Sequence, residues 1–234
     1  MGYPFYYFDP TYILVLIGVV LSLAAQAKVR STFDKYSRVR SISGMTGAEA
    51  AQRILHRAGI FDVQIERISG HLTDHYDPRK KVLRLSDSVY DSSSIAAIGV
   101  AAHECGHAIQ HQNAYIPLMF RNTLVPIVNF GAAIAWPLIL IGLLLAGSQT
   151  LINLGIILFS TAVLFQLVTL PVEFNASRRA IQRLGETGIL HGEEINYSKK
   201  VLSAAALTYV AAAATSILQL LRLIILFGGG RRRD

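Results

Sequence analysis

"LINLGIILFSTAVLFQLVTL" (residues 151–170) is a run of twenty residues without a charged side chain. A helix of about 20 apolar residues can cross the roughly 30 Å hydrocarbon core of a bilayer, so this run predicts a membrane-spanning helix. A second run, "PIVNFGAAIAWPLILIGLLLAG" (126–147), precedes it, and only the neutral "SQT" (148–150) separates the two. Together they predict two spans joined by a short loop.

Two more apolar runs lie toward the ends of the chain. "YILVLIGVVLSLAAQA" (12–27) is short for a span, and residues 201–229 are long enough but contain Arg222 and many alanines. Hydrophobic residues make up 52% of the 234 residues, which exceeds the usual share in a soluble domain. We therefore predict an integral membrane protein with three spans and a fourth candidate.

The positions of Lys and Arg predict the orientation in the cell membrane. Five of them lie in residues 28–40, directly after the first run, and cytoplasmic segments carry an excess of these residues. Residues 28–125 and 171–200 would then be cytoplasmic, and residues 148–150 would lie outside. A fourth crossing would place the terminal "RRRD" outside, against the same rule, and the sequence leaves this open.

The charge and the cysteine content agree with that orientation. The net charge of +7 fits Lys and Arg at lipid head groups or a solvated basic face, so we expect a lipid bilayer and no nucleic acid as partner. The single cysteine excludes an internal disulfide. The chain then divides into a first span (1–27), a membrane-proximal part with the "HECGH" helix (28–125), two spans (126–170), a further helix with a cytoplasmic segment (171–200), and a fourth candidate span with a basic tail (201–234).

Shorter elements are expected between the first and second spans. Thr46 and Glu49 form a capping-box pattern that starts a helix. Residues 62–68 and 80–86 alternate polar and apolar side chains, which predicts strands in a small hairpin or edge sheet. Residues 92–112 predict a helix whose apolar part is too short to span, so it should lie at the membrane surface. The expected fold is a mainly α, polytopic helical membrane protein with this small sheet.

"AAHECGHAIQHQ" (101–112) within that last helix has the spacing of a zinc site. Residues four apart on a helix share a face, so His103 and His107 can bind one ion. Glu104 is offset by one position and could accept a proton from a zinc-activated water, then return it to the leaving amine. The pattern is short enough to arise by chance, so it needs support from the rest of the chain.

A third ligand must come from elsewhere. His111 continues the spacing of four residues, but it lies about 12 Å along the helix axis from His103. We therefore expect it at the surface or in contact with a residue that binds the metal. Glu173 is the better candidate, because it follows the third apolar run on the predicted cytoplasmic side. Pro171 suits the first turn of a new helix or a kink. The alternative is that Glu173 pairs with a neighbouring arginine, Arg178 or Arg179.

Further polar residues could have supporting roles. Ser177 or Asn175 could hold a ligand, and Arg178 and Arg179 could anchor the interface or face the reaction intermediate. His75 or Asp77 could stabilise an oxyanion, or Asp74, His75 and Asp77 could simply build a turn. Cys105 points away from the metal face and should be buried. Gly106 predicts either close approach of a backbone near the metal or tight packing against a span.

Five blocks of sequence resemble the YugP-type family of membrane zinc metallopeptidases, which has the gluzincin plan of the HtpX peptidases. The blocks are "AAHECGHAIQ", "LFQLVTLPVEFNASRRA", "TGAEAAQRIL", "LTDHYDPRKKVLRLS" and "VLSAAALTYVAAAATS", within residues 9 to 222. The resemblance implies a zincin-type catalytic helix with one Zn²⁺ per chain, bound by His103, His107 and Glu173, and Glu104 as the base. HtpX-like proteins tend to have Asp where this chain has Ser177. The resemblance therefore leaves open which residue holds a zinc-binding histidine in place.

The resemblance implies a zinc-dependent membrane metalloendopeptidase, a hydrolase of membrane-associated or misfolded polypeptides, with its site on the cytoplasmic side of a multi-pass protein. Zincins commonly hold an extended substrate against an edge strand, which "KVLRL" (81–85) could supply. One alternative is a zinc-binding membrane scaffold without turnover. Another is a site-2-type intramembrane protease, but its aspartate motif is not found in the later runs. The oligomeric state is not predicted.

Overall fold

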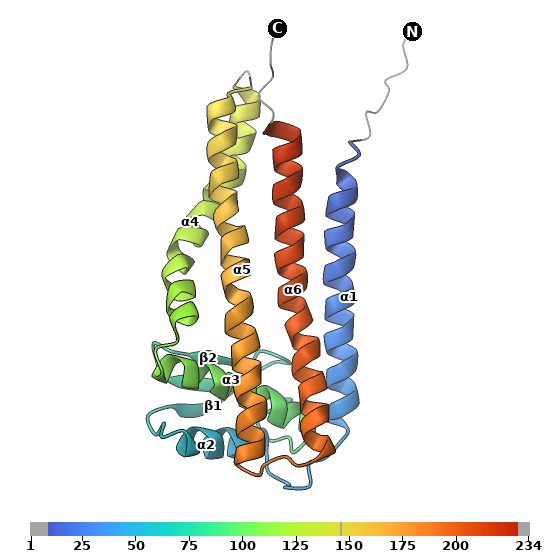
Figure 1. Ribbon diagram of the computed structural model, residues 1–234, viewed down its shortest axis with the longest axis vertical. Coiled ribbons are helices and arrows are strands. Elements are labelled where there is room, and N and C mark those ends of the chain that lie inside the picture. Colours follow the sequence, from blue (N-terminus) through green and yellow to red (C-terminus); the bar gives the residue numbers. More distant parts are fainter. Residues whose placement is uncertain (1–8, 146, 229–234) are drawn as a thin grey trace. The chain divides into compact units, whose positions relative to one another are not determined.

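The computed structural model describes residues 9–145 and 147–228, in which six helices and three strands are found (Figure 1). The helices are α1 (Tyr12–Ser37), α2 (Gly47–Arg57), α3 (Ile95–Gln112), α4 (Ile116–Leu144), α5 (Gln149–Glu186) and α6 (Glu193–Phe227). By length and composition, α1, α4, α5 and α6 could each cross a membrane. The mainly helical membrane fold is thus confirmed, and α6 is the fourth candidate span. The terminal "RRRD" lies outside the described residues.

The long helices extend beyond the apolar runs that predicted them. Helix α5 continues through Pro171 to Glu186, so Glu173 lies on the same helix as the third apolar run and not on a separate one. Proline removes one backbone hydrogen-bond donor, but the backbone hydrogen bonds of the other residues can maintain a long helix that contains it. Helix α4 likewise begins at Ile116, ten positions before the expected residue 126.

The chain forms two compact units, and the first consists of Met1–Ala24, Leu124–Leu167 and Ala211–Asp234. Its described residues include only two charged side chains, Asp9 and Arg222, and these form an ion pair of 2.9 Å. A partly buried charge is tolerated when it is paired, which explains an arginine within an apolar helix. The core of this unit joins α4, α5 and α6 through Ala135, Ile139, Phe159, Val163 and Leu223.

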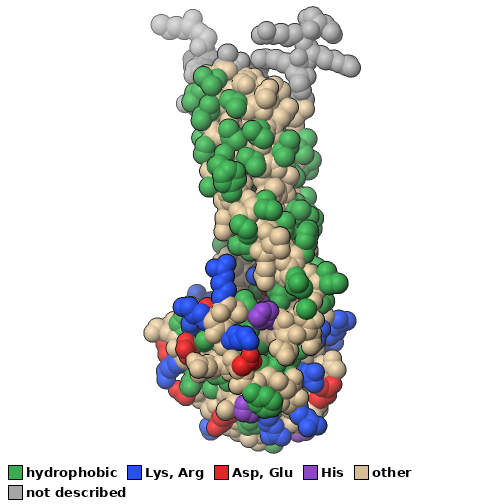
Figure 2. Space-filling model, turned by 90° about the vertical axis from the view of Figure 1, so that its left-hand side faces the viewer, with side chains coloured by type: hydrophobic (Ala, Val, Ile, Leu, Met, Phe, Trp, Pro, Cys, Tyr) green, Lys and Arg blue, Asp and Glu red, His purple; other side chains and the backbone are tan. Residues whose placement is uncertain are grey.

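The second unit consists of Ala25–Thr123 and Val168–Val210. Its core packs α2, α3 and β3 (Val82–Ser86) against the parts of α1, α5 and α6 that belong to it. Charged and histidine side chains gather over this unit in Figure 2, whereas hydrophobic side chains predominate on the other. The predicted capping box at Thr46 and Glu49 is present at the start of α2.

A three-stranded sheet lies in the second unit, with strand order β1-β3-β2. The strands β1 (Gln64–Ile68) and β3 fall within the two predicted runs, but they pair in parallel. The hairpin is formed by β3 and β2 (His75–Asp77), a strand that the sequence did not predict. Because β3 is central, the prediction that "KVLRL" forms an edge was wrong. Asp74 accepts hydrogen bonds from the backbone and hydroxyl of Ser86, which holds β2 beside β3.

Candidate metal centre

Helices α3 and α5 bring the three predicted ligands together. The candidate ligand atoms of His103, His107 and Glu173 all lie within 4.8 Å of one another. The Oε2 atom of Glu173 is 3.3 Å from Nε2 of His103 and 3.5 Å from Nε2 of His107. Two imidazoles and a carboxylate are ligands that zinc accepts in a tetrahedral site with one open position.

Gly106 allows this close approach. A Cβ atom at Gly106 would lie only 2.5 Å from the carbonyl oxygen of Ala176 in α5. Glycine therefore lets the backbones of α3 and α5 meet, one residue before His107 and three residues after Glu173. The sequence predicted either close approach of a backbone near the metal or tight packing against a span. Both apply, because α5 is a candidate span and also carries the third candidate ligand.

Gln110 determines which nitrogen of His107 carries the proton. The amide NH₂ of Gln110 donates to the carbonyl of Val172 at 2.8 Å and to Oδ1 of Asn175 at 3.0 Å. Its Oε1 atom therefore faces Nδ1 of His107 at 3.1 Å and can only accept. A proton on Nδ1 satisfies this contact and leaves Nε2, which points toward Glu173, as the nitrogen that can bind a metal. Arg179 extends this chain by donating to Asn175 at 2.7 Å.

Ser177 occupies the corresponding place beside His103. Its hydroxyl lies 3.1 Å from Nδ1 of His103, so this imidazole also presents Nε2 toward Glu173. A hydroxyl can accept from Nδ1 without carrying a charge, so the serine can orient the ring where HtpX-like proteins tend to have aspartate.

The carboxylate of Glu173 fits a bound cation. The residue is only 4% exposed, and its Oε2 atom has no hydrogen-bond partner among the described residues. Its Oε1 atom lies 3.5 Å from Nη1 of Arg121 in α4. Buried charges are normally paired or bound to metal, so Oε2 and the two Nε2 atoms form a set of donors suited to one ion. The arginine that contacts Glu173 is Arg121, not Arg178 or Arg179 as the alternative had it.

Glu104 and β2 line a cavity of about 210 Å³ together with His107, Glu173 and Arg121. The edge strand β2 contributes His75 and Tyr76 to its wall, and α6 contributes Tyr209. Burial raises the pKa of Tyr76 to about 12, so its hydroxyl stays protonated. Asp77 accepts from the backbone of the following turn, as the turn interpretation predicts, whereas His75 faces the cavity.

The remaining singled-out residues lie apart from the ligand group. His111 is exposed, and its Nδ1 atom lies 2.9 Å from the hydroxyl of Tyr76, in agreement with its exclusion as a ligand. Cys105 is fully buried, and burial raises the pKa of its thiol well above the usual range.

Sequence reasoning missed Gln110, Arg121 and Tyr209. Gln110 could have been found, because it lies three residues after His107 and therefore on the same face of the helix. Arg121 and Tyr209 stand in the apolar helices α4 and α6, and no local spacing relates them to the histidines.

Comparison with known proteins identifies relatives along nearly the whole chain. A family described as "Putative neutral zinc metallopeptidase" matches residues 11–228. The chain is 56% identical over 198 residues to the "Putative membrane protease YugP" of Bacillus subtilis (strain 168), which covers 85% of this chain and 88% of that protein. No solved structure matches. The resemblance drawn from the sequence blocks is confirmed.

Proposed function

Because the chain belongs to the neutral zinc metallopeptidase family, we propose that it is a membrane endopeptidase whose single zinc ion is bound by His103, His107 and Glu173. The observation that carries the proposal is the convergence of these three side chains within 4.8 Å, beside the carboxylate of Glu104. When bound, zinc supplies a Lewis acid that activates water and polarises a peptide carbonyl.

Glu104 is the proposed general base. It follows His103 directly, lines the cavity and is only 8% exposed, so bulk water competes little for its carboxylate. The carboxylate would accept the proton of the attacking water and deliver it to the nitrogen of the broken peptide bond. One group can perform both transfers, because the proton it gains in the first step is the one the leaving amine needs.

The cavity favours an extended polypeptide as substrate. Its volume of about 210 Å³ can hold single side chains but no folded domain. The strand β2 pairs with β3 along one edge only, so its other edge can pair with a substrate strand next to Glu104. Unfolded segments of membrane-associated or misfolded proteins have this extended form. The Lys and Arg residues after the first span support a cytoplasmic position of the site.

The catalytic role is tested by the substitution Glu104→Gln in the purified full-length protein. We expect a bound zinc content equal to that of the unsubstituted protein, and a loss of cleavage of a fluorescently labelled unfolded polypeptide of at least 100-fold, because positioned acid–base groups contribute about 10²- to 10⁴-fold. Glu186→Gln, at an exposed position of α5, is the matched control and should retain full activity. Equal cleavage by Glu104→Gln would exclude this mechanism.

The third ligand is tested separately by Glu173→Gln, which keeps the shape of the side chain and an oxygen for Arg121. Loss of the anionic ligand should lower the zinc content measured by mass spectrometry of the metal. Unchanged zinc affinity would move the role of third ligand to another residue. Zinc binding without chelator-sensitive cleavage in the unsubstituted protein would favour the scaffold alternative.

A further inference from the structure

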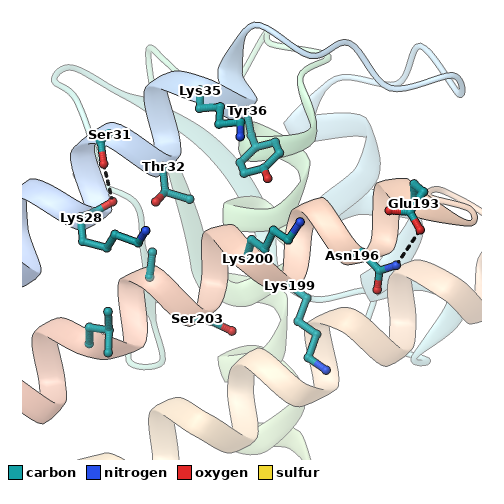
Figure 3. A pocket seen from close by; sticks show the side chains of 12 residues that line it. Lys28, Ser31, Thr32, Lys35, Tyr36, Glu193, Asn196, Lys199, Lys200 and Ser203 are labelled. Atoms are coloured by element: carbon teal, nitrogen blue, oxygen red, sulfur yellow. Dashed lines mark hydrogen bonds between the residues drawn. The ribbon is translucent and has the colours of Figure 1, made fainter.

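A basic cavity of about 920 Å³ lies between α1 and α6 within the second unit, away from the candidate metal centre. Lys28 and Lys35 extend from α1, and Lys200 from α6, into the space between the two helices, whereas Lys199 extends to the other side of α6 (Figure 3). Hydroxyl and amide groups complete the wall: Ser31, Thr32, Asn196 and Ser203.

The lysines of this cavity contact tyrosine rings more than carboxylates: the ammonium groups of Lys35 and Lys200 lie over Tyr36 and Tyr197, 5.4 and 5.5 Å from the ring centroids. Among the described residues, none of the four lysines forms an ion pair. The cavity contains one carboxylate, Glu193, whose Oε1 accepts from Asn196 at 3.1 Å. Several ammonium groups beside hydroxyl donors suit a phosphate group, which offers several anionic oxygens.

The lysines stand where two apolar helices begin and end. Lys28 directly follows sixteen residues of α1 without a charge, Tyr12–Ala27, and Lys200 directly precedes twenty-one such residues of α6, residues 201–221. These positions correspond to the head-group level if the apolar stretches cross the hydrocarbon core. A phosphate at this level is most readily supplied by a lipid.

A second cavity of about 530 Å³ adjoins the first. It lies between α5 and α6 and shares Lys199, Ser203 and Leu207 with the basic cavity. Most of its other side chains are apolar: Phe174, Ile181, Leu202, Ala206 and Val210. A basic cavity that borders an apolar one has the two environments that a phospholipid needs for its head group and its acyl chain.

We propose that these two cavities form a binding site for an anionic phospholipid, with its phosphate among Lys28, Lys35 and Lys200 and an acyl chain between α5 and α6. Lipid binding at these cavities can be measured without peptide hydrolysis. A basic residue near an anionic head group contributes enough for about a fivefold change in affinity, so removing two lysines should weaken binding roughly 25-fold.

The test uses the purified full-length protein in neutral detergent. Retained lipid is counted by native mass spectrometry during titration with phosphatidylglycerol, phosphatidylcholine, glycerol phosphate or inorganic phosphate. We expect phosphatidylglycerol to bind most tightly, and Lys28→Gln/Lys200→Gln to weaken it about 25-fold. The matched control Arg57→Gln/Lys80→Gln removes two exposed charges outside both cavities and should bind as the unsubstituted protein does.

A third variant separates a lipid from free phosphate. Ala206→Leu adds volume to the apolar cavity, so it should weaken phosphatidylglycerol binding while glycerol phosphate still binds at the lysines. Retained glycerol phosphate binding also shows that the variant is folded. Equal phosphatidylglycerol binding by all variants would overturn the proposal. Inorganic phosphate binding as tight as that of lipid, unaffected by Ala206→Leu, would replace it with a free-phosphate site.

Discussion

At the scale of single residues, the neutral amide of Gln110 orients His107 without adding a charge. Its NH₂ group has two acceptors, so its oxygen is left for Nδ1 of His107. Groups that orient a metal ligand in this way typically contribute 10- to 100-fold to metal affinity. An amide acceptor in this position holds the proton on Nδ1 and leaves Nε2 as the nitrogen that can bind a metal.

We predict that Gln110→Ala weakens zinc binding by about 10- to 100-fold, because the His107 ring loses the acceptor that holds its tautomer and orientation. Competition with a chelating dye measures the affinity. Gln112→Ala, at an exposed position at the end of the same helix, is the control and should bind zinc normally. A Gln110→Ala variant with the zinc affinity of the unsubstituted protein would show that His107 needs no such support.

At the scale of helices, the contact between α3 and α5 depends on Gly106. Adding a methyl group there places Cβ 2.5 Å from a backbone carbonyl that cannot rotate away. The helices must then separate, and the distance between His107 and Glu173 must increase. Overpacking of this kind costs about 1–3 kcal/mol in the free energy of unfolding.

We predict that Gly106→Ala lowers the melting temperature and the zinc affinity together, because both depend on the same helix contact. Gly185→Ala is a matched control in α5, since its Cβ would meet only Ile195 Cδ1 at an ordinary 3.4 Å. That variant should be neutral or slightly stabilised, as alanine favours helix by about 1 kcal/mol over glycine. Normal zinc binding by Gly106→Ala would mean that α5 can shift without moving Glu173.

At the scale of the whole molecule, the orientation in the membrane is predicted from four candidate spans and the distribution of basic residues. Cys105 is the single cysteine, and its burial and raised pKa make it unreactive toward maleimides. The native thiol therefore gives no background when a cysteine is introduced elsewhere. Gln52 in α2 and Thr150 at the start of α5 are both exposed. The predicted orientation places them on opposite sides of the membrane.

We predict that Thr150→Cys reacts with a membrane-impermeant maleimide in intact spheroplasts, whereas Gln52→Cys reacts only after permeabilisation. The reason is that residues 28–125 begin with the basic stretch 28–40, and such stretches are retained in the cytoplasm. Mass-shift gels measure the labelled fraction. The opposite labelling pattern would place the candidate active site outside the cell.

The sequence by itself was sufficient to predict the helical membrane fold, the strands β1 and β3, and the two histidines on one helix face. Each depends on local properties: the length of an apolar run, the alternation of side chains, or a spacing of four residues. Helix α2 was predicted for the same reason, since its capping box lies within four consecutive residues.

Other features were decided only by tertiary structure, because they join residues that no local spacing relates. Asp9 and Arg222 pair across 213 positions, and Arg121 contacts Glu173 across 52. The contact of Asp74 with Ser86 places β2 beside β3. Strand β2 is therefore at the edge of the sheet and β3 is central, contrary to the prediction. Periodicity describes how a segment presents its own side chains. Which segments meet depends on close packing, as at Gly106, where a missing methyl group lets two helices bring a carboxylate to two imidazoles.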